Sequence, residues 1–235
     1  MRIAAATDLR ACLDELAAAF HLDHPHIDIR PTFGASGALV AQIRTGLEAD
    51  LFLSADIQYA RDLAAAGLAA PDDVFPTGLG GLVIWVRNES PLDVSAQGAG
   101  VLGDPTVRRI AIANPRHAPY GRAAMAALAH LGLDRVLAEK FATAESAAQA
   151  AQYVDSGAAD VGLLPLALAR GPRLEERGRF WKVPADHHPP IEHGGVILTK
   201  AFDKEAAALF RDFLLGARGS AILTKYGFIP AGAAP

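Results

Sequence analysis

Small polar residues stand at four places in this sequence where an apolar stretch gives way to an amphipathic one. The four turns are Thr7-Asp8, residues 34–37 (GASG), residues 117–121 (HAPYG) and residues 145–147 (ESA). A helix is expected to begin at each of them. The first turn of a helix leaves backbone N–H groups unpaired, and the peptide dipoles add roughly half a positive charge there. An anion is therefore the natural occupant of such a turn.

Hydroxyl groups or glycines strengthen this interpretation at three of the turns. Thr7 and Ser36 would each add a hydroxyl donor beside the amides. Gly34 and Gly37 are expected to permit positive φ and to leave the backbone uncovered, and Gly121 to do the same after Tyr120. The alternative is that each Ser or Thr only caps its helix, since both are common N-cap residues. The pattern alone indicates a small-anion site without identifying the anion.

Strands and helices alternate around these turns. The expected strands are residues 3–6, 27–33, 50–54, 82–86, 109–113, 160–164 and 195–199. The expected helices are one ending near Phe20, then residues 37–45, 57–66, 121–130, 144–156 and 204–215, and a shorter one ending at Tyr226. Residues 184–193 are expected to form a loop. This alternation predicts parallel sheets covered by helices, in which ligands bind beyond the carboxyl ends of the strands.

The chain is expected to divide into two α/β lobes. A composition shift occurs at residues 76–81 (PTGLGG), and a second crossing is expected near residue 190. The predicted lobes are residues 1–80 with 192–235, and residues 81–191. The two crossings between them would form a hinge.

Composition excludes several classes of function. The 235 residues carry 22 basic and 26 acidic side chains, well mixed, for a net charge of −4. No basic stripe suggests nucleic acid, so local groups must hold any anion. The longest apolar runs are too short to span a bilayer. The single cysteine, Cys12, allows no intrachain disulfide and is expected in the core, on one helical face with Leu16 and Phe20.

Six segments of the sequence resemble the periplasmic molybdate-binding proteins, the ModA family of ABC transporter receptors. They are AAATDL (4–9), GASGAL (34–39), ADLFLSAD (49–56), IANPRHAPYGRAA (112–124), AAQYVDSGAADVG (150–162) and ILTKYGF (222–228). The resemblance runs from residue 3 to about residue 230. It implies a two-lobed type II periplasmic-binding fold, each lobe a mainly parallel sheet flanked by helices, with molybdate or tungstate closed between the lobes.

The resemblance also implies partners and a location. The chain would be a monomer without enzymatic activity or cofactor, and it would deliver its oxyanion to the membrane permease of an ABC transporter. It would be periplasmic. No signal peptide is present in this numbering, and we expect one to have been removed.

Five residues of this sequence match the family's ligand positions. The two hydroxyl ligands fall on Thr7 and Ser36, and three backbone amides fall on Asp8, Tyr120 and Ala147. One branch of the family has a tyrosine one residue past GLL, but that position is Pro165 here, so its hydrogen bond is absent or replaced. The Asp8 carboxylate would repel a dianion, so we expect it to point away and complement the helix dipole.

Two alternatives remain open. The first is a receptor for another tetrahedral oxyanion: phosphate or arsenate if Asp8 turns inward as a proton acceptor, or sulfate, which only size would exclude. The second is a metal-dependent hydrolase that uses a cluster of His187, His188 and His193 near Asp186 and Glu192. Against the hydrolase, Ser36 lacks the nucleophile-elbow spacing, and no phosphate-binding loop or dinucleotide motif is present.

Overall fold

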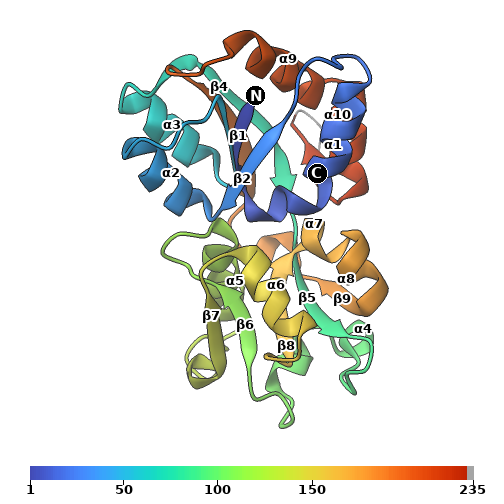
Figure 1. Ribbon diagram of the computed structural model, residues 1–235. Helices are drawn as coiled ribbons and strands as arrows, with labels where there is room; N and C mark the ends of the chain where they lie inside the picture. The colour runs from blue at the N-terminus through green and yellow to red at the C-terminus, as the bar shows by residue number, and fades with distance from the viewer. Residues whose placement is uncertain (232–235) are drawn as a thin grey trace. The chain divides into compact units, whose positions relative to one another are not determined.

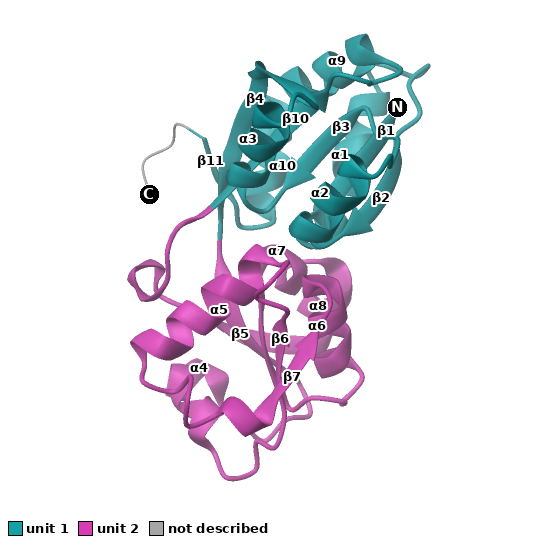
Figure 2. Cartoon of the chain, turned by 90° about the vertical axis from the view of Figure 1, so that its left-hand side faces the viewer, with its two compact units in different colours: residues 1–80, 192–235 teal, residues 81–191 magenta. Residues whose placement is uncertain are grey.

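The computed structural model describes residues 1–231, which form two compact units. Unit 1 comprises Met1–Gly80 and the chain from Glu192 onward, and unit 2 comprises Gly81–Ile191. Figure 2 colours the two units separately. Each unit has its own β-sheet with helices packed on it (Figure 1).

The sheet of unit 1 has six strands in the order β11-β4-β10-β3-β1-β2. The strands are β1 (Arg2–Ala6), β2 (Arg30–Gly34), β3 (Leu51–Ser54), β4 (Ala69–Gly80), β10 (Ile191–Leu198) and β11 (Ile229–Pro230). β1 lies between β2 and β3 and runs parallel to both. β10 is antiparallel to β3, and β11 is antiparallel to β4. The parallel part therefore brings the carboxyl ends of β1, β2 and β3 to one edge of the sheet.

Five helices cover this sheet. They are α1 (Arg10–His21), α2 (Ser36–Arg44), α3 (Ile57–Ala65), α9 (Lys204–Leu215) and α10 (Ala217–Lys225). α2 and α3 pack on one face through a cluster that includes Leu39, Ile43, Phe52 and Leu63, while α1 contacts α9 and α10 on the other (Figure 1). The small side chains of β1, an Ile followed by three alanines, are all buried and let both helical layers approach it.

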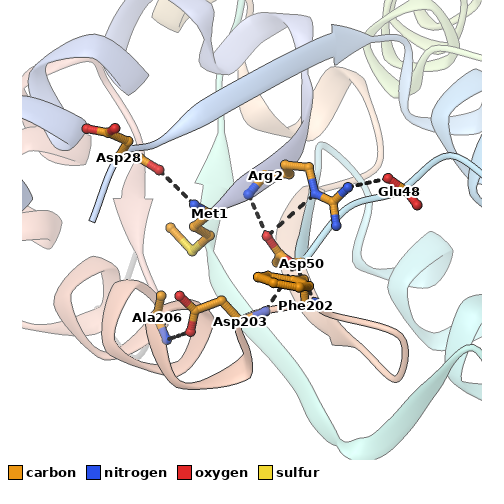
Figure 3. Close-up of polar contacts among 8 residues, drawn as sticks. All are labelled: Met1, Arg2, Asp28, Glu48, Asp50, Phe202, Asp203 and Ala206. Carbon is orange, nitrogen blue, oxygen red and sulfur yellow. Dashed lines mark hydrogen bonds and ion pairs between the residues drawn. The ribbon is translucent and has the colours of Figure 1, made fainter. Parts of the chain in front are cut away.

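A buried carboxylate ties three segments of unit 1 together at the opposite end of β3. Asp50 accepts hydrogen bonds from the backbone N–H of Arg2 at 2.6 Å and of Phe202 at 2.7 Å (Figure 3). Burial raises the pKa of this carboxyl, but these N–H donors and the Arg2 guanidinium more than offset burial and hold it below its ordinary value. Asp50 thus joins the start of β1 to the segment before α9.

Replacing Asp50 with alanine is expected to lower the free energy of unfolding by about 2–4 kcal/mol, because the amides of Arg2 and Phe202 would lose their acceptor. Chemical denaturation measures this loss. Asp72→Ala, at an exposed position of the same unit, is the control and should change stability by less than about 0.5 kcal/mol. Equal stability of the two variants would show that Asp50 does not join these segments.

The sheet of unit 2 has five strands in the order β7-β6-β8-β5-β9. They are β5 (Leu82–Arg87), β6 (Ile110–Ala113), β7 (Phe141–Ala144), β8 (Val161–Pro165) and β9 (Gly178–Lys182). β6 is parallel to β7 and β8, whereas β5 is antiparallel to β8 and β9. The helices are α4 (Val94–Gln97), α5 (Pro119–His130), α6 (Ala147–Asp155), α7 (Leu166–Ala169) and α8 (Pro172–Arg177). Both α5 and α6 pack on β6 and β8.

The predicted α/β class, with helices flanking a sheet in each unit, is confirmed, but both sheets are mixed rather than mainly parallel. The parallel parts are β2-β1-β3 and β7-β6-β8. The strands that follow the two crossings, β5 and β10, run antiparallel to their neighbours. Strand direction depends on how the chain enters a sheet, and the hydrophobic pattern of a strand does not encode it.

Some predicted boundaries are also wrong. Residues 144–146 precede α6 rather than belonging to it, because residues 141–144 form β7. β10 begins at Ile191, inside the segment predicted as a loop. β4 and β9 were not predicted, since neither has a clean two-residue alternation of buried side chains. Among the described residues no helix has the length and apolar character needed to cross a membrane.

Candidate anion-binding site

Thr7 and Ser36 lie at the same edge of the unit 1 sheet. β1 and β2 pair in parallel with Ala6 opposite Gly34, so the residues that follow each strand are neighbours. Thr7 begins a single 3-10 turn, Thr7–Leu9, that leads into α1, and Ser36 is the first residue of α2. Both side chains are buried, Thr7 6 % and Ser36 1 % exposed. The structure therefore places the two predicted hydroxyl donors at the same edge of this sheet.

The environment of Ser36 directs its hydroxyl hydrogen. The backbone N–H of Ala55, just after β3, donates a hydrogen bond to Ser36 Oγ at 3.1 Å. Because the oxygen accepts this bond, the hydroxyl hydrogen must point elsewhere. No residue in the described part of the chain accepts it. The Ser36 hydroxyl is thus oriented to donate its hydrogen. The residue after β3, Ala55, contributes to this orientation through its backbone N–H.

Neither Thr7 nor Ser36 caps its helix, so that interpretation is wrong for both. The N-cap residues are Ala6 and Ala35, and no side chain caps either helix start. In both cases the hydroxyl sits one residue inside the turn. A helix start without a side-chain cap leaves its first N–H groups available to another acceptor.

The positive φ predicted for the glycines in these turns is also wrong. Gly34, Gly37 and Gly121 all have ordinary negative or extended φ rather than positive φ. Gly121 is required for a different reason: a Cβ atom there would lie 2.2 Å from Ala113 O and 2.8 Å from Pro115 N. Its missing side chain lets the start of α5 pack directly on the end of β6.

The Asp8 carboxyl is not stabilised as predicted, by complementing the helix dipole. Its side chain is 2 % exposed, and its Oδ2 lies 3.5 Å from Nε2 of His193 on β10. Burial raises the pKa of Asp8 to about 7, although a hydrogen bond from its own backbone lowers it in part. A carboxylate stabilised by the helix dipole would instead have a lowered pKa. Asp8 is directed at His193, which also lies in unit 1.

The corresponding turns of unit 2 lie at one edge of its sheet. β6 and β7 pair in parallel with Ala113 opposite Ala144, and Asn114 N donates to Ala144 O at 2.7 Å. Tyr120 is the second residue of α5, whose N-cap, Ala118, provides no side-chain cap. Its ring is buried.

Ala147 is the first residue of α6, at the same edge of the unit 2 sheet. Here the cap interpretation is correct: the Ser146 hydroxyl accepts from Gln149 N at 3.2 Å. The side-chain oxygen of Gln149 in turn accepts from Glu145 N at 2.7 Å. Neither bond uses the backbone N–H of Ala147, which is the first N–H of the helix.

The family of the chain follows from a match over nearly all its described length. The family model for bacterial extracellular solute-binding proteins matches residues 1–229. The chain belongs to this family. The predicted relationship to transport receptors is confirmed.

Relatives of this solute-binding protein are similar along almost the whole chain. The molybdate-binding protein ModA of Azotobacter vinelandii is 34 % identical over 228 residues, which cover 97 % of this chain and 89 % of that protein. ModA of Rhodobacter capsulatus is 34 % identical over 197 residues, covering 84 % of this chain and 75 % of that protein. The solved structure of the Azotobacter vinelandii periplasmic molybdate-binding protein superposes with a TM-score of 0.91 over 97 % of this chain and 98 % of that one, at 34 % identity.

The histidine cluster proposed for a metal-dependent hydrolase does not form in this solute-binding protein. His193 lies in β10 of unit 1 beside Asp8, whereas His187 of unit 2 stacks on His130 with ring centroids 4.3 Å apart. Across residues 1–231 no group of three or more His, Cys, Asp or Glu side chains could hold a metal ion. Nearness in sequence was misleading because the chain crosses between units at residue 191. The two relatives are molybdate-binding proteins and not enzymes, in agreement with the prediction for this chain.

Sequence reasoning missed two residues of this solute-binding protein's candidate site. Ala55 orients Ser36 through its backbone N–H, a role that a side-chain motif does not reveal. His193 faces Asp8 although it lies 185 positions later in the sequence. Only the tertiary pairing of β10 with β3, in which Gly194 lies opposite Ser54, places His193 at this edge.

Proposed function

We propose that this protein captures molybdate or tungstate in the periplasm and delivers it to the permease of an ABC importer. The observation that carries the proposal is the pair of buried hydroxyls, Thr7 and Ser36, set beside two helix starts without side-chain caps. The molybdate-binding function of the two relatives at 34 % identity supports this ligand. Membership of this chain in the family of bacterial extracellular solute-binding proteins supports the periplasmic location and the permease partner.

The proposed ligands come from both units. In unit 1 they are the hydroxyls of Thr7 and Ser36 and the amide of Asp8. In unit 2 they are the amides of Tyr120 and Ala147, each at the start of a helix. Pro165 ends β8 and has no N–H, so it supplies no donor in place of the family's tyrosine. We infer that the protein acts as a monomer whose two units are its lobes, residues 1–80 with 192–235 and residues 81–191. The two crossings of the chain between these units would act as the hinge.

The chemistry of these donors favours a dianion that carries no proton. Molybdate and tungstate need only donors, whereas hydrogen phosphate also needs an acceptor for its own O–H. The carboxylate that would supply this acceptor, Asp8, is directed at His193. An unmatched buried polar group costs about 1–3 kcal/mol, which corresponds to roughly tenfold to a hundredfold weaker binding of phosphate. Sulfate is a smaller dianion, and its shorter reach would stretch these hydrogen bonds.

Calorimetric titration with molybdate, tungstate, sulfate and phosphate tests this function. We expect saturable binding of one molybdate or tungstate per chain and at least about tenfold weaker binding of sulfate and phosphate. Preference for phosphate over molybdate would support the alternative oxyanion receptor. No binding of any of the four anions would contradict the proposed function.

A further inference from the structure

Asp8 is the one buried aspartate of three in residues 1–231 that lacks a strong partner for a negative charge. Asp50 accepts backbone N–H donors, and Asp155 pairs with Arg173 at 2.6 Å and with Arg177 at 3.1 Å. No described residue donates a hydrogen bond to Asp8 Oδ2. Its nearest ionisable partner is His193, at 3.5 Å and 1 % exposed. A charged carboxylate is therefore poorly compensated at this position.

Burial affects the two groups in opposite directions. It raises the pKa of Asp8 to about 7 and lowers the pKa of His193 to about 3. Over the range between these values the pair holds one proton and no net charge, as a neutral carboxyl beside a neutral imidazole. Above neutrality the proton leaves and a buried negative charge remains in the same residue whose amide is proposed to bind the oxyanion.

We propose that Asp8 and His193 form a proton-holding pair that couples oxyanion capture to the uptake of one proton, so that the site binds its dianion best when the pair is neutral. This inference rests on the proposed function, because it needs a dianion beside the Thr7-Asp8 turn. Asp8 is an anion-binding residue through its amide, and His193 is a positioning residue that acts through the Asp8 carboxyl.

Other ionisable groups near the pair keep their protonation state over the pH range in which Asp8 titrates. On α1, burial raises the pKa of the Cys12 thiol and the Asp8 charge raises it further, so the thiol stays protonated. Glu15 has a lowered pKa, chiefly because Lys225 donates to it, and stays ionised. The pKa of Tyr226, the residue just after α10, is raised to about 12, chiefly by burial.

Four further side chains lie near the pair or its surroundings, and none of them provides a buried counter-charge. The ring of Phe228 packs against the His193 ring, with centroids 4.9 Å apart. Arg61 and Glu192 line a cavity of about 680 Å³ together with His193, and both are exposed and of opposite sign. Arg10, two residues after Asp8, lies over the Phe33 ring at 4.2 Å. Within the pair, Asp8 is thus the group that changes charge around neutrality.

The sign of the effect follows from linkage. A bound dianion disfavours the Asp8 carboxylate and so raises its pKa above the value of about 7 in the structure without ligand. Below that value the carboxyl is protonated with or without ligand, and affinity does not depend on pH through this group. Between the two pKa values binding takes up a proton, and affinity falls by up to about tenfold for each pH unit.

Calorimetry of the unmodified protein tests the proposal without any variant. Molybdate is titrated between about pH 6 and pH 9, at each pH in two buffers of different ionisation enthalpy. We expect uptake of about half to one proton per molybdate near pH 8, close to none near pH 6, and at least about tenfold weaker binding at pH 9 than at pH 6.5. Binding of molybdate with no proton uptake at any pH would overturn the proposal while leaving the proposed function intact. No molybdate binding at any pH would instead overturn the proposed function.

Variants then assign the proton to the pair. Asp8→Asn is expected to bind molybdate with a flat pH profile, because the amide cannot ionise. His193→Gln is expected to shift the midpoint of the profile to lower pH, since glutamine can donate to the carboxylate but cannot share its proton. The matched control is Asp14→Asn, the same charge change at an exposed position on α1, which should keep the unmodified profile. An unmodified profile in Asp8→Asn would contradict the assignment to Asp8, and an unmoved midpoint in His193→Gln would contradict the role of His193.

Discussion

Ser36→Ala is expected to weaken molybdate binding at least about tenfold, and the double variant Thr7→Ala/Ser36→Ala by about a hundredfold or more. A hydrogen bond to a charged acceptor contributes about 1.5–3 kcal/mol, and each substitution removes one such donor. Ser36 is held for this role because its oxygen already accepts the Ala55 N–H at 3.1 Å. Titration calorimetry at about pH 6.5, where the Asp8 carboxyl is mostly protonated, measures the effect with little interference from the proton-holding pair.

Ser36→Ala is also expected to lower stability by about 1–3 kcal/mol, because the buried Ala55 N–H loses its acceptor. Ser54→Ala separates this effect from binding. Ser54 is equally buried, but its hydroxyl donates to Asp56 O at 2.7 Å and so has no hydrogen left for an anion. We expect Ser54→Ala to lose stability and to keep its affinity for molybdate. Similar affinity losses in both variants would show that Ser36 acts through the fold and not as a ligand.

Gly121→Ala is expected to destabilise unit 2 by about 3 kcal/mol or more. The added Cβ would meet Ala113 O at 2.2 Å and Pro115 N at 2.8 Å, and both atoms belong to the backbone, so no side-chain rotation relieves the overlap. The start of α5 would have to move away from β6, and the proposed donor at Tyr120 would move with it. We therefore expect a lower unfolding midpoint together with weaker molybdate binding.

Gly103→Ala provides the matched control in the same unit. A Cβ at Gly103 would meet no atom within 4 Å, and its φ is not positive. This substitution should leave both the unfolding midpoint and the affinity nearly unchanged. If Gly121→Ala and Gly103→Ala unfold at the same denaturant concentration, the close packing of α5 on β6 does not constrain residue 121.

Much of the fold was predictable because local patterns determine it. The strands at β1, β3, β5, β6 and β8 are short apolar runs, and α2, α3 and α9 have clear amphipathic periods. Their positions could be predicted to within a few residues. What could not be predicted depends on long-range pairing. The direction of β5 and β10 follows from the crossings near residues 80 and 191, and the short strands β9 and β11 form only against partners distant in sequence.

The candidate site divides in the same way. Thr7, Ser36, Tyr120 and Ala147 could be named from the sequence because each belongs to a local strand-to-helix turn. The environment of Asp8 could not, because burial and His193 determine it and neither is visible in the sequence around residue 8. The histidine cluster failed for the same reason: residues 187 and 193 are close in sequence but belong to different units.

A crystal structure of the protein with molybdate, with the metal located by its anomalous scattering, tests the proposed site most directly. We expect one molybdenum peak, with ligand oxygens about 2.7–3.2 Å from Ser36 Oγ, Thr7 Oγ1 and the Tyr120 backbone nitrogen. The Asp8 carboxyl should still face His193 and should not contact the anion. A molybdenum peak away from the Thr7 and Ser36 hydroxyls, or an anion bound by the Asp8 carboxyl, would contradict this account.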